Sequence, residues 1–431
     1  MIRQSISCIA WALLTTTAAT AQKPIDKIIN ATEVERIERI LAADEMLGRK
    51  SFSPEIDKAA DFIAAEFKAA GLSYFAGLSS YKQSFSMIKT KLVSANGQAD
   101  GVTLPADDFI MVTQQASLSI NEKSGYAQVH LDSTDNLFDQ YRKLTEGTQN
   151  TVLWVSRAQA KNFARLRRFA GRDAFDGRPN LLFVLSDKPA AEYQFQFQHQ
   201  VTSSALANVV GVLPGKSRKD ELVIFSGHYD HIGTGKPNAQ GDSIYNGAND
   251  DAAGTTAVML LAKYFAAQKN NERTLVFVAF TAEEIGGFGS QYFSRQINAD
   301  KTIAMFNIEM IGTESQWGKN SAYITGFEKS DFGKILQGNL QGSAFKFEPD
   351  PYPRQNLFYR SDNATLAALG VPAHTISTSK MDTEKFYHTQ EDEIETLDIN
   401  NMTEIIKAIA ISSKSIVSGE DTPSRVAPLK R

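Results

Sequence analysis

Short apolar runs alternate with helical segments along this chain from Ala207 onward. The apolar runs are residues 208–215, 221–227, 274–280, 304–310 and 372–378. Segments with the apolar spacing of helices lie between or after them, at residues 250–268, 287–296, 330–340 and 361–370. This alternation predicts an α/β fold with a mixed, mostly parallel sheet and helices on both faces. Ligands of such folds bind beyond the carboxyl ends of the strands, so we expect functional residues there.

The length of the chain and the changes in composition along it indicate two domains. The chain of 431 residues can form a large core and still accommodate a second domain. Residues 95–200 are rich in Gln, Asp and Ser and contain short strand candidates, whereas the N-terminal segments 31–47 and 55–71 have helical periodicity. We expect a main domain and a smaller inserted domain, bounded as follows: main domain 22–94 and 201–420, inserted domain 95–200, tail 421–431.

The first 21 residues have the features of a secretory signal. Arg3 supplies positive charge, an apolar stretch follows, and Ala19-Thr20-Ala21 offers a cleavage site before Gln22. The stretch is too short for a good membrane span, and no later segment has the apolar length of one. We therefore expect an exported protein, either periplasmic or secreted.

The composition limits which partners the protein can bind and what can stabilise its fold. Cys8 is the only cysteine and lies within the predicted signal, so the mature chain would have no disulfide and would depend on its core and on metal. The formal net charge of −4 argues against nucleic acid as a partner, because phosphate binding requires clustered positive charge. The oligomeric state does not follow from the sequence.

Acidic and histidine side chains gather at the ends of the apolar runs. In chain order they are His228, Asp230, His231, Asp250, Asp251, Glu283, Glu284, Glu309 and His388, the last preceded by Tyr387. Carboxylates and imidazoles that converge at one sheet edge, without cysteine, are typical of a hydrolytic zinc site. Taken singly, the pair Glu283-Glu284 would suit a helix start, and Asp250 a helix cap.

Paired metal chemistry explains the pair of glutamates. Two metal ions close together need a bridging carboxylate and terminal ligands, and they lower the pKa of a water molecule between them. A further carboxylate, not bound to metal, must accept the proton of that water. Adjacent glutamates on a bend can serve these two needs, one as a ligand and the other as a base.

The ordered motifs GHYDHIG, NGANDDAAG, AFTAEEIGGFGS, NIEMIG and YHTQEDE resemble those of the zinc-dependent exopeptidases of aminopeptidase type. The resemblance covers residues 31–90 and 200–415 and implies two co-catalytic zinc ions on an α/β sheet. Carried over by position, it implies one zinc ligand at His228, a bridging carboxylate at Asp250, ligands of the other zinc at Glu284 and His388, and the general base at Glu283.

The resemblance also implies three supporting roles. Glu309 occupies a position where the family usually has Asp, and it would complete the first zinc site with His228 and Asp250. Asp230 would orient a ligand imidazole. Tyr387 matches a position whose hydroxyl stabilises the tetrahedral intermediate in some relatives.

Two further segments have counterparts in the family. The insert at residues 95–200 lies where many relatives carry a protease-associated domain, and a lid over the site would be a sensible role for it. The stretch FYRSDNATLAALGVPA, residues 358–373, resembles the substrate-side loop and the strand that follows it. We expect Ser361, Asp362 and Asn363 to cap a helix, and a place at the border of the pocket is a second role open to them.

The leading hypothesis is an exported metallo-aminopeptidase that removes N-terminal residues from peptides. A carboxypeptidase or a dipeptidase on the same scaffold is an alternative. A second alternative is a glutaminyl cyclase with a single zinc, although the chain is long for one. A third is a binding protein that retains the fold without catalysis, against which the complete set of ligands and base argues.

Overall fold

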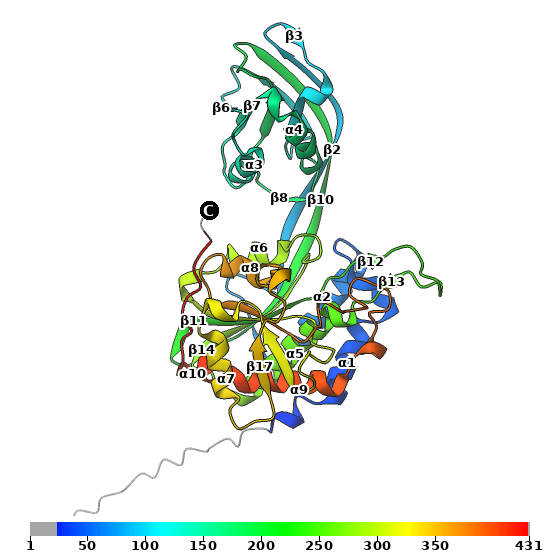
Figure 1. Ribbon diagram of the computed structural model, residues 1–431, viewed down its shortest axis with the longest axis vertical. Helices are drawn as coiled ribbons and strands as arrows, with labels where there is room; N and C mark the ends of the chain where they lie inside the picture. The colour runs from blue at the N-terminus through cyan, green and yellow to red at the C-terminus, as the bar shows by residue number, and fades with distance from the viewer. Residues whose placement is uncertain (1–23, 430–431) are drawn as a thin grey trace, which may run out of the picture.

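The computed structural model describes residues 24–429 and contains two lobes (Figure 1). The predicted signal at residues 1–21 lies outside the described residues. The large lobe is built around a twelve-stranded sheet, and the distal lobe around a four-stranded sheet. Two long antiparallel strands, β2 (Lys82–Ala99) and β10 (Tyr193–Leu213), run from the large lobe into the distal lobe.

The main sheet has the strand order β17-β16-β18-β15-β11-β14-β10-β2-β3, with β1 and β5 paired to β10 and β8 paired to β2. Strands β14, β11, β15 and β18 are mutually parallel, and β10 is antiparallel to β14. The remaining strands have these bounds: β1 Ser73–Tyr74, β3 Val102–Thr103, β5 Ser117–Asn121, β8 Ala174–Phe175, β11 Arg218–His228, β14 Arg273–Phe280, β15 Thr302–Ile308, β16 Ser321–Ile324, β17 Lys346–Pro349 and β18 Ala373–Ser377.

Helices cover both faces of this sheet, as the sequence predicts. The larger core lies under α1 (Ala31–Leu41), α2 (Pro54–Ala69), α5 (Ala253–Gln268), α7 (Phe332–Asn339) and α9 (Ile399–Ser412). The opposite face packs against α6 (Phe288–Ser294) and α8 (Asn363–Ala367), and α10 (Lys414–Ser418) ends the helical part of the chain. Side chains of β14 alternate between the two cores, so Phe277 contacts the first and Val278 the second.

The distal lobe has its own apolar cores on the two faces of the sheet β4-β9-β7-β6. The pairs β6–β7 and β7–β9 are parallel, and β4–β9 is antiparallel. The bounds are β4 Phe109–Val112, β6 Ala127–Leu131, β7 Thr151–Val155, β9 Leu181–Leu185, α3 Leu137–Thr145 and α4 Ala160–Leu166. Strands β7 and β9 are two of the short strand candidates that the sequence offers within residues 95–200, in the runs NTVLWVS and NLLFVLS.

One helix is shorter than the apolar spacing suggests. The periodic segment 31–47 forms α1 only as far as Leu41, and a short 3-10 segment, Asp44–Arg49, follows. Leu47 and Gly48 have positive φ values of 43° and 67°, so the chain turns there instead of continuing the helix. This turn carries Arg49 into the interior. Within residues 24–429, no helix combines the length and the apolar character needed to cross a membrane.

Candidate metal centre

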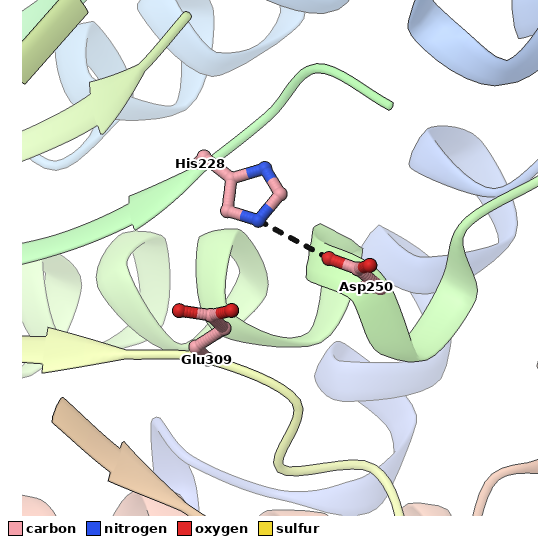
Figure 2. A group of neighbouring side chains, drawn as sticks. All are labelled: His228, Asp250 and Glu309. Atoms are coloured by element: carbon pink, nitrogen blue, oxygen red, sulfur yellow. Dashed lines mark ion pairs between the residues drawn. The ribbon is translucent and has the colours of Figure 1, made fainter. Parts of the chain in front are cut away.

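His228, Asp250 and Glu309 meet at the carboxyl edge of the parallel strands (Figure 2). His228 is the last residue of β11, Glu309 directly follows β15, and Asp250 lies in the turn that leads into α5. Their ligand atoms lie within 4.8 Å of one another, and His228 Nε2 is 3.2 Å from Asp250 Oδ1. All three side chains are buried or nearly so, and the set of one imidazole and two carboxylates suits Zn²⁺.

A second group shares Asp250 with the first. It contains Glu284 and His231, again with ligand atoms within 4.8 Å. His388 Nε2 lies 3.2 Å from both Asp250 Oδ2 and Glu284 Oε2. His231 lies with its Nδ1 2.7 Å from Glu284 Oε1. One carboxylate between two groups of ligand atoms is the arrangement that a pair of metal ions requires.

Several of these atoms are buried without a hydrogen bond to any residue in the described range 24–429. They are His228 Nε2, His231 Nδ1 and Nε2, Glu284 Oε1 and Glu309 Oε2. Although some lie close to each other, they are not oriented as donor and acceptor. Buried polar atoms are normally hydrogen-bonded, so atoms that converge without bonding indicate a missing shared partner. Divalent cations fit this donor set.

The electrostatics of the group agree with cation binding. Burial opposes ionisation of Asp250, but its contacts with His228 and His388 outweigh burial and hold its pKa below the ordinary value. Contacts with Asp250 and then with Glu284 raise the pKa of His388 to about 10. The imidazoles thus supply positive charge to the carboxylates. A divalent ion would take over this role and release their protons.

Glu283 belongs to neither group of ligand atoms but lines the same pocket. Burial raises its pKa well above the ordinary value, and the nearby carboxylate of Glu309 raises it further. A carboxylate that is held back from ionisation beside a metal site is suited to accept a proton from water.

Asp230 holds the turn that carries the two glutamates. Its carboxylate accepts the main-chain N–H of Glu283 at 3.0 Å and of Glu284 at 3.3 Å, and the hydroxyl of Ser51 at 3.1 Å. His228 Nδ1 lies 3.1 Å from the main-chain oxygen of Asp230 but 3.8 Å from its carboxylate. The carbonyl therefore orients the imidazole, and the carboxylate orients the glutamates.

Arg49 is a supporting residue that the sequence does not reveal. It is fully buried and donates to four main-chain oxygens at 2.6–2.8 Å. Two of these oxygens, those of Tyr229 and Gly247, belong to the loops that carry His228 and Asp250. Arg49 thus ties together two loops that are far apart in the sequence.

Two buried carboxylates fix the turn around Asp250. Asp392 accepts the N–H of Asn249 at 2.8 Å and of Asp250 at 3.0 Å. Asp251 accepts the N–H groups of His228 and Met310, and that of Gly254 in the first turn of α5. Asp392 lies in the motif YHTQEDE, four residues after His388, so this spacing was the available signal for its role.

A pocket with a cavity volume of about 80 Å³ opens beside these residues. Its apolar lining comes from Met310, Tyr323, Leu357 and Met381, and Tyr387 also lines it. The ring of Tyr387 stacks on that of His388, with centroids 3.9 Å apart. The pocket thus combines the carboxylate cluster with space for an apolar group.

The expectation that residues 361–363 cap a helix is wrong. The side chain of Asp362 makes no capping hydrogen bond to α8. Ser361 lines the pocket and accepts a hydrogen bond from Asn307 Nδ2 at 2.7 Å, and Asn363 donates to the main-chain oxygens of Phe358 and Ala373. All three side chains are buried. Ser361 and Asn363 form their hydrogen bonds with β15, β18 and the preceding turn instead of with the first turn of α8.

Residues 208–412 match the family model described as Peptidase family M28. A "Probable zinc metalloprotease" of Pyricularia oryzae is 36% identical over 112 residues, which are 26% of this chain and 22% of that protein. "Leucine aminopeptidase 1" of Ajellomyces dermatitidis is 28% identical over 239 residues, 52% of this chain and 59% of that protein. The alignments therefore span less than two thirds of either relative.

The fold has a counterpart of known structure. The aminopeptidase from Aneurinibacillus sp. strain AM-1 superposes with a TM-score of 0.54 at 16% identity, covering 94% of this chain and 97% of the other. At this identity the likeness concerns the fold alone.

Proposed function

Because residues 208–412 match the model of Peptidase family M28, we propose that this chain is a zinc-dependent exopeptidase of aminopeptidase type, exported and with two zinc ions. The observation that carries this proposal is the position of Asp250, shared by two groups of ligand atoms with Glu283 beside them. Export rests on the N-terminal sequence, in which Arg3, an apolar stretch and small residues precede Gln22.

The proposed ligands follow the two groups. His228 and Glu309 would hold one zinc, Glu284 and His388 the other, and Asp250 would bridge them. Glu309 fits this role in spite of its extra methylene, because its carboxylate reaches the first group and its Oε2 has no hydrogen bond within the described residues. His231 would hold the carboxylate of Glu284 in place from the side.

In the reaction, zinc would supply Lewis acidity and lower the pKa of the attacking water. Glu283 takes the proton of this water as its oxygen bonds to the carbonyl carbon of the first peptide bond. The C–N bond then breaks, and Glu283 delivers the proton to the departing amine nitrogen. Tyr387, which lines the pocket, would donate a hydrogen bond from its hydroxyl to the developing oxyanion. Asp230 keeps Glu283 in position through the hydrogen bond to its main chain.

The test is mass spectrometry of the products of a leucine-initiated peptide, its N-acetylated form and a glutamine-initiated peptide, each with and without a chelator. The proposal predicts free leucine from the first peptide, no cleavage of the acetylated form, and no product after chelation. Shortening from the C-terminus would instead make the protein a carboxypeptidase. Loss of ammonia from the glutamine peptide, with the chain uncut, would make it a cyclase.

A further inference from the structure

One cation stands at the edge of the carboxylate-rich pocket. Arg360 is the sole lysine or arginine among the described residues that line it. It follows the short 3-10 turn Leu357–Tyr359 and directly precedes Ser361, and both Leu357 and Ser361 also line the pocket. The backbone on either side therefore holds the main chain of Arg360 beside the pocket.

The guanidinium of Arg360 lacks a carboxylate partner within residues 24–429. Its one side-chain contact is a 3.5 Å hydrogen bond from Nη1 to Gln355 Oε1, at the limit for such a bond, and its side chain is exposed. Three other arginines of the large lobe have carboxylate partners: Arg36 pairs with Glu66, Arg39 with Glu35, and Arg273 with Glu221. An arginine that lines a pocket full of carboxylates, yet pairs with none, is available to an incoming anion.

Arg360 and Tyr387 line the same pocket. The four carboxylates of the lining, those of Asp250, Glu283, Glu284 and Glu309, would be balanced by two divalent cations. Among the lining residues of a loaded pocket, the charge that is left over is then that of Arg360.

We propose that Arg360 binds a carboxylate of the substrate, so that the preferred substrates are peptides with a carboxylate close to the scissile bond. This inference rests on the proposed function and defines its substrate class. Two sources fit the chemistry: the C-terminal carboxylate of a dipeptide, and an acidic side chain. A guanidinium makes two parallel hydrogen bonds to either. The apolar lining at Met310, Tyr323 and Leu357 accommodates the uncharged part of the substrate.

The experiment compares kcat/KM for Leu-Gly, Leu-Gly-amide and Leu-Asp-amide, using the zinc-loaded wild type, R360Q and R354Q. Arg354 is the matched control, because it is exposed, lies six residues earlier and is not part of the pocket lining. A charge-assisted bond to an exposed guanidinium corresponds to a preference of about tenfold. R360Q should abolish this preference and leave Leu-Gly-amide unchanged, whereas R354Q should behave like the wild type.

The results distinguish the two sources of the carboxylate, and they distinguish the role of Arg360 from the proposed aminopeptidase activity. A preference for Leu-Gly identifies the C-terminal carboxylate, and a preference for Leu-Asp-amide identifies the acidic side chain. Equal rates for all three wild-type substrates, or an equal loss for all of them in R360Q, would overturn the role of Arg360 while leaving the aminopeptidase proposal intact. Failure of the zinc-loaded wild type to cleave any of them would overturn the proposed function itself. Calorimetry with the E283Q protein, which does not turn the peptides over, should rank the three substrates by dissociation constant in the same order as kcat/KM does.

Discussion

Replacement of Arg49 by methionine should destabilise the fold and weaken metal binding together. Methionine fills much of the same volume but donates no hydrogen bond. The change would remove a donor from four main-chain oxygens. That of Gly247 keeps the N–H of Ala252 at 3.2 Å, so three are left without the donor they have here, those of Leu41, Tyr229 and Asn246. Because Tyr229 and Gly247 lie in the loops of His228 and Asp250, the metal ligands lose a common support.

The size of the effect follows from the hydrogen bonds. A buried acceptor that loses its partner costs about 1–3 kcal/mol, so three of them cost at least about 3 kcal/mol. The neighbouring Glu38 does not add an unpaired charge near neutral pH, because burial raises its pKa to about 8. The lower end of the range therefore applies, and about 3 kcal/mol is a large part of the 5–15 kcal/mol typical of a folded protein.

Urea denaturation gives the free energy of unfolding, and competition with a chelator gives the zinc affinity. R36M is the control, since Arg36 forms partly exposed ion pairs with Glu33 and Glu66 and its loss should cost about 0–1 kcal/mol. R49K retains a charge and some donors and should fall between the wild type and R49M. A loss below about 1 kcal/mol in R49M, with zinc affinity unchanged, would refute the supporting role of Arg49.

Two other substitutions test the buried carboxylates. D392N should weaken zinc binding by roughly ten- to a hundredfold, because the amide can accept only one of the two N–H groups that Asp392 holds. E391Q, a change of the exposed neighbour, should leave zinc binding as it is in the wild type. A change below about twofold in D392N would contradict this role of Asp392. E38Q should remove a pH dependence of stability: Glu38 has a pKa of about 8 when folded against an ordinary 4.5, so its contribution is complete below pH 4.5 and is lost as the pH rises toward 8. Between pH 4.5 and 8, the free energy of unfolding of E38Q, measured by urea denaturation, should rise relative to that of the wild type by at most about 1.4 kcal/mol per pH unit. If the two proteins show the same dependence of this free energy on pH, Glu38 does not titrate in this way.

His228, Glu284 and Glu309 were accessible to sequence reasoning because each closely follows an apolar run. A buried parallel strand ends at the same sheet edge as its neighbours, so residues after such runs converge. Asp250 and His388 lie in loops, and the motifs NGANDDAAG and YHTQEDE pointed to them. The structure brings His228, Asp250 and Glu309 together at that edge, and Glu284 and His388 around the same Asp250.

The residues that hold the site in place could not be identified from the sequence. Their partners are distant along the chain, and they act through hydrogen bonds to main-chain oxygens. Arg49 and Tyr229 are 180 residues apart, and Arg49 enters the interior through a turn with positive φ at Leu47 that interrupts a helical pattern. A main-chain oxygen has no sequence signature, so a side chain that binds several of them cannot be distinguished in the sequence from a surface arginine.

The distal lobe was anticipated in part. The runs that form β7 and β9 are strongly apolar and were predicted as strands. Strand β2 was not, because its outer half is largely exposed and pairs with β10 through a register shift at Gln198 and His199. Such a strand owes its stability to its partner rather than to local periodicity. The assignment of this region as a protease-associated domain stays a prediction.

The most direct test of the central claim is the zinc content of the wild type and of E283Q, measured by elemental analysis after dialysis, together with hydrolysis of a leucine-initiated peptide. We expect two zinc ions per chain in both proteins and a loss of activity of roughly 10²–10⁴-fold in E283Q, because Glu283 moves protons and does not hold metal. Loss of zinc from E283Q, or near-normal hydrolysis by a variant that retains both ions, would contradict the division of roles between Glu283 and Glu284.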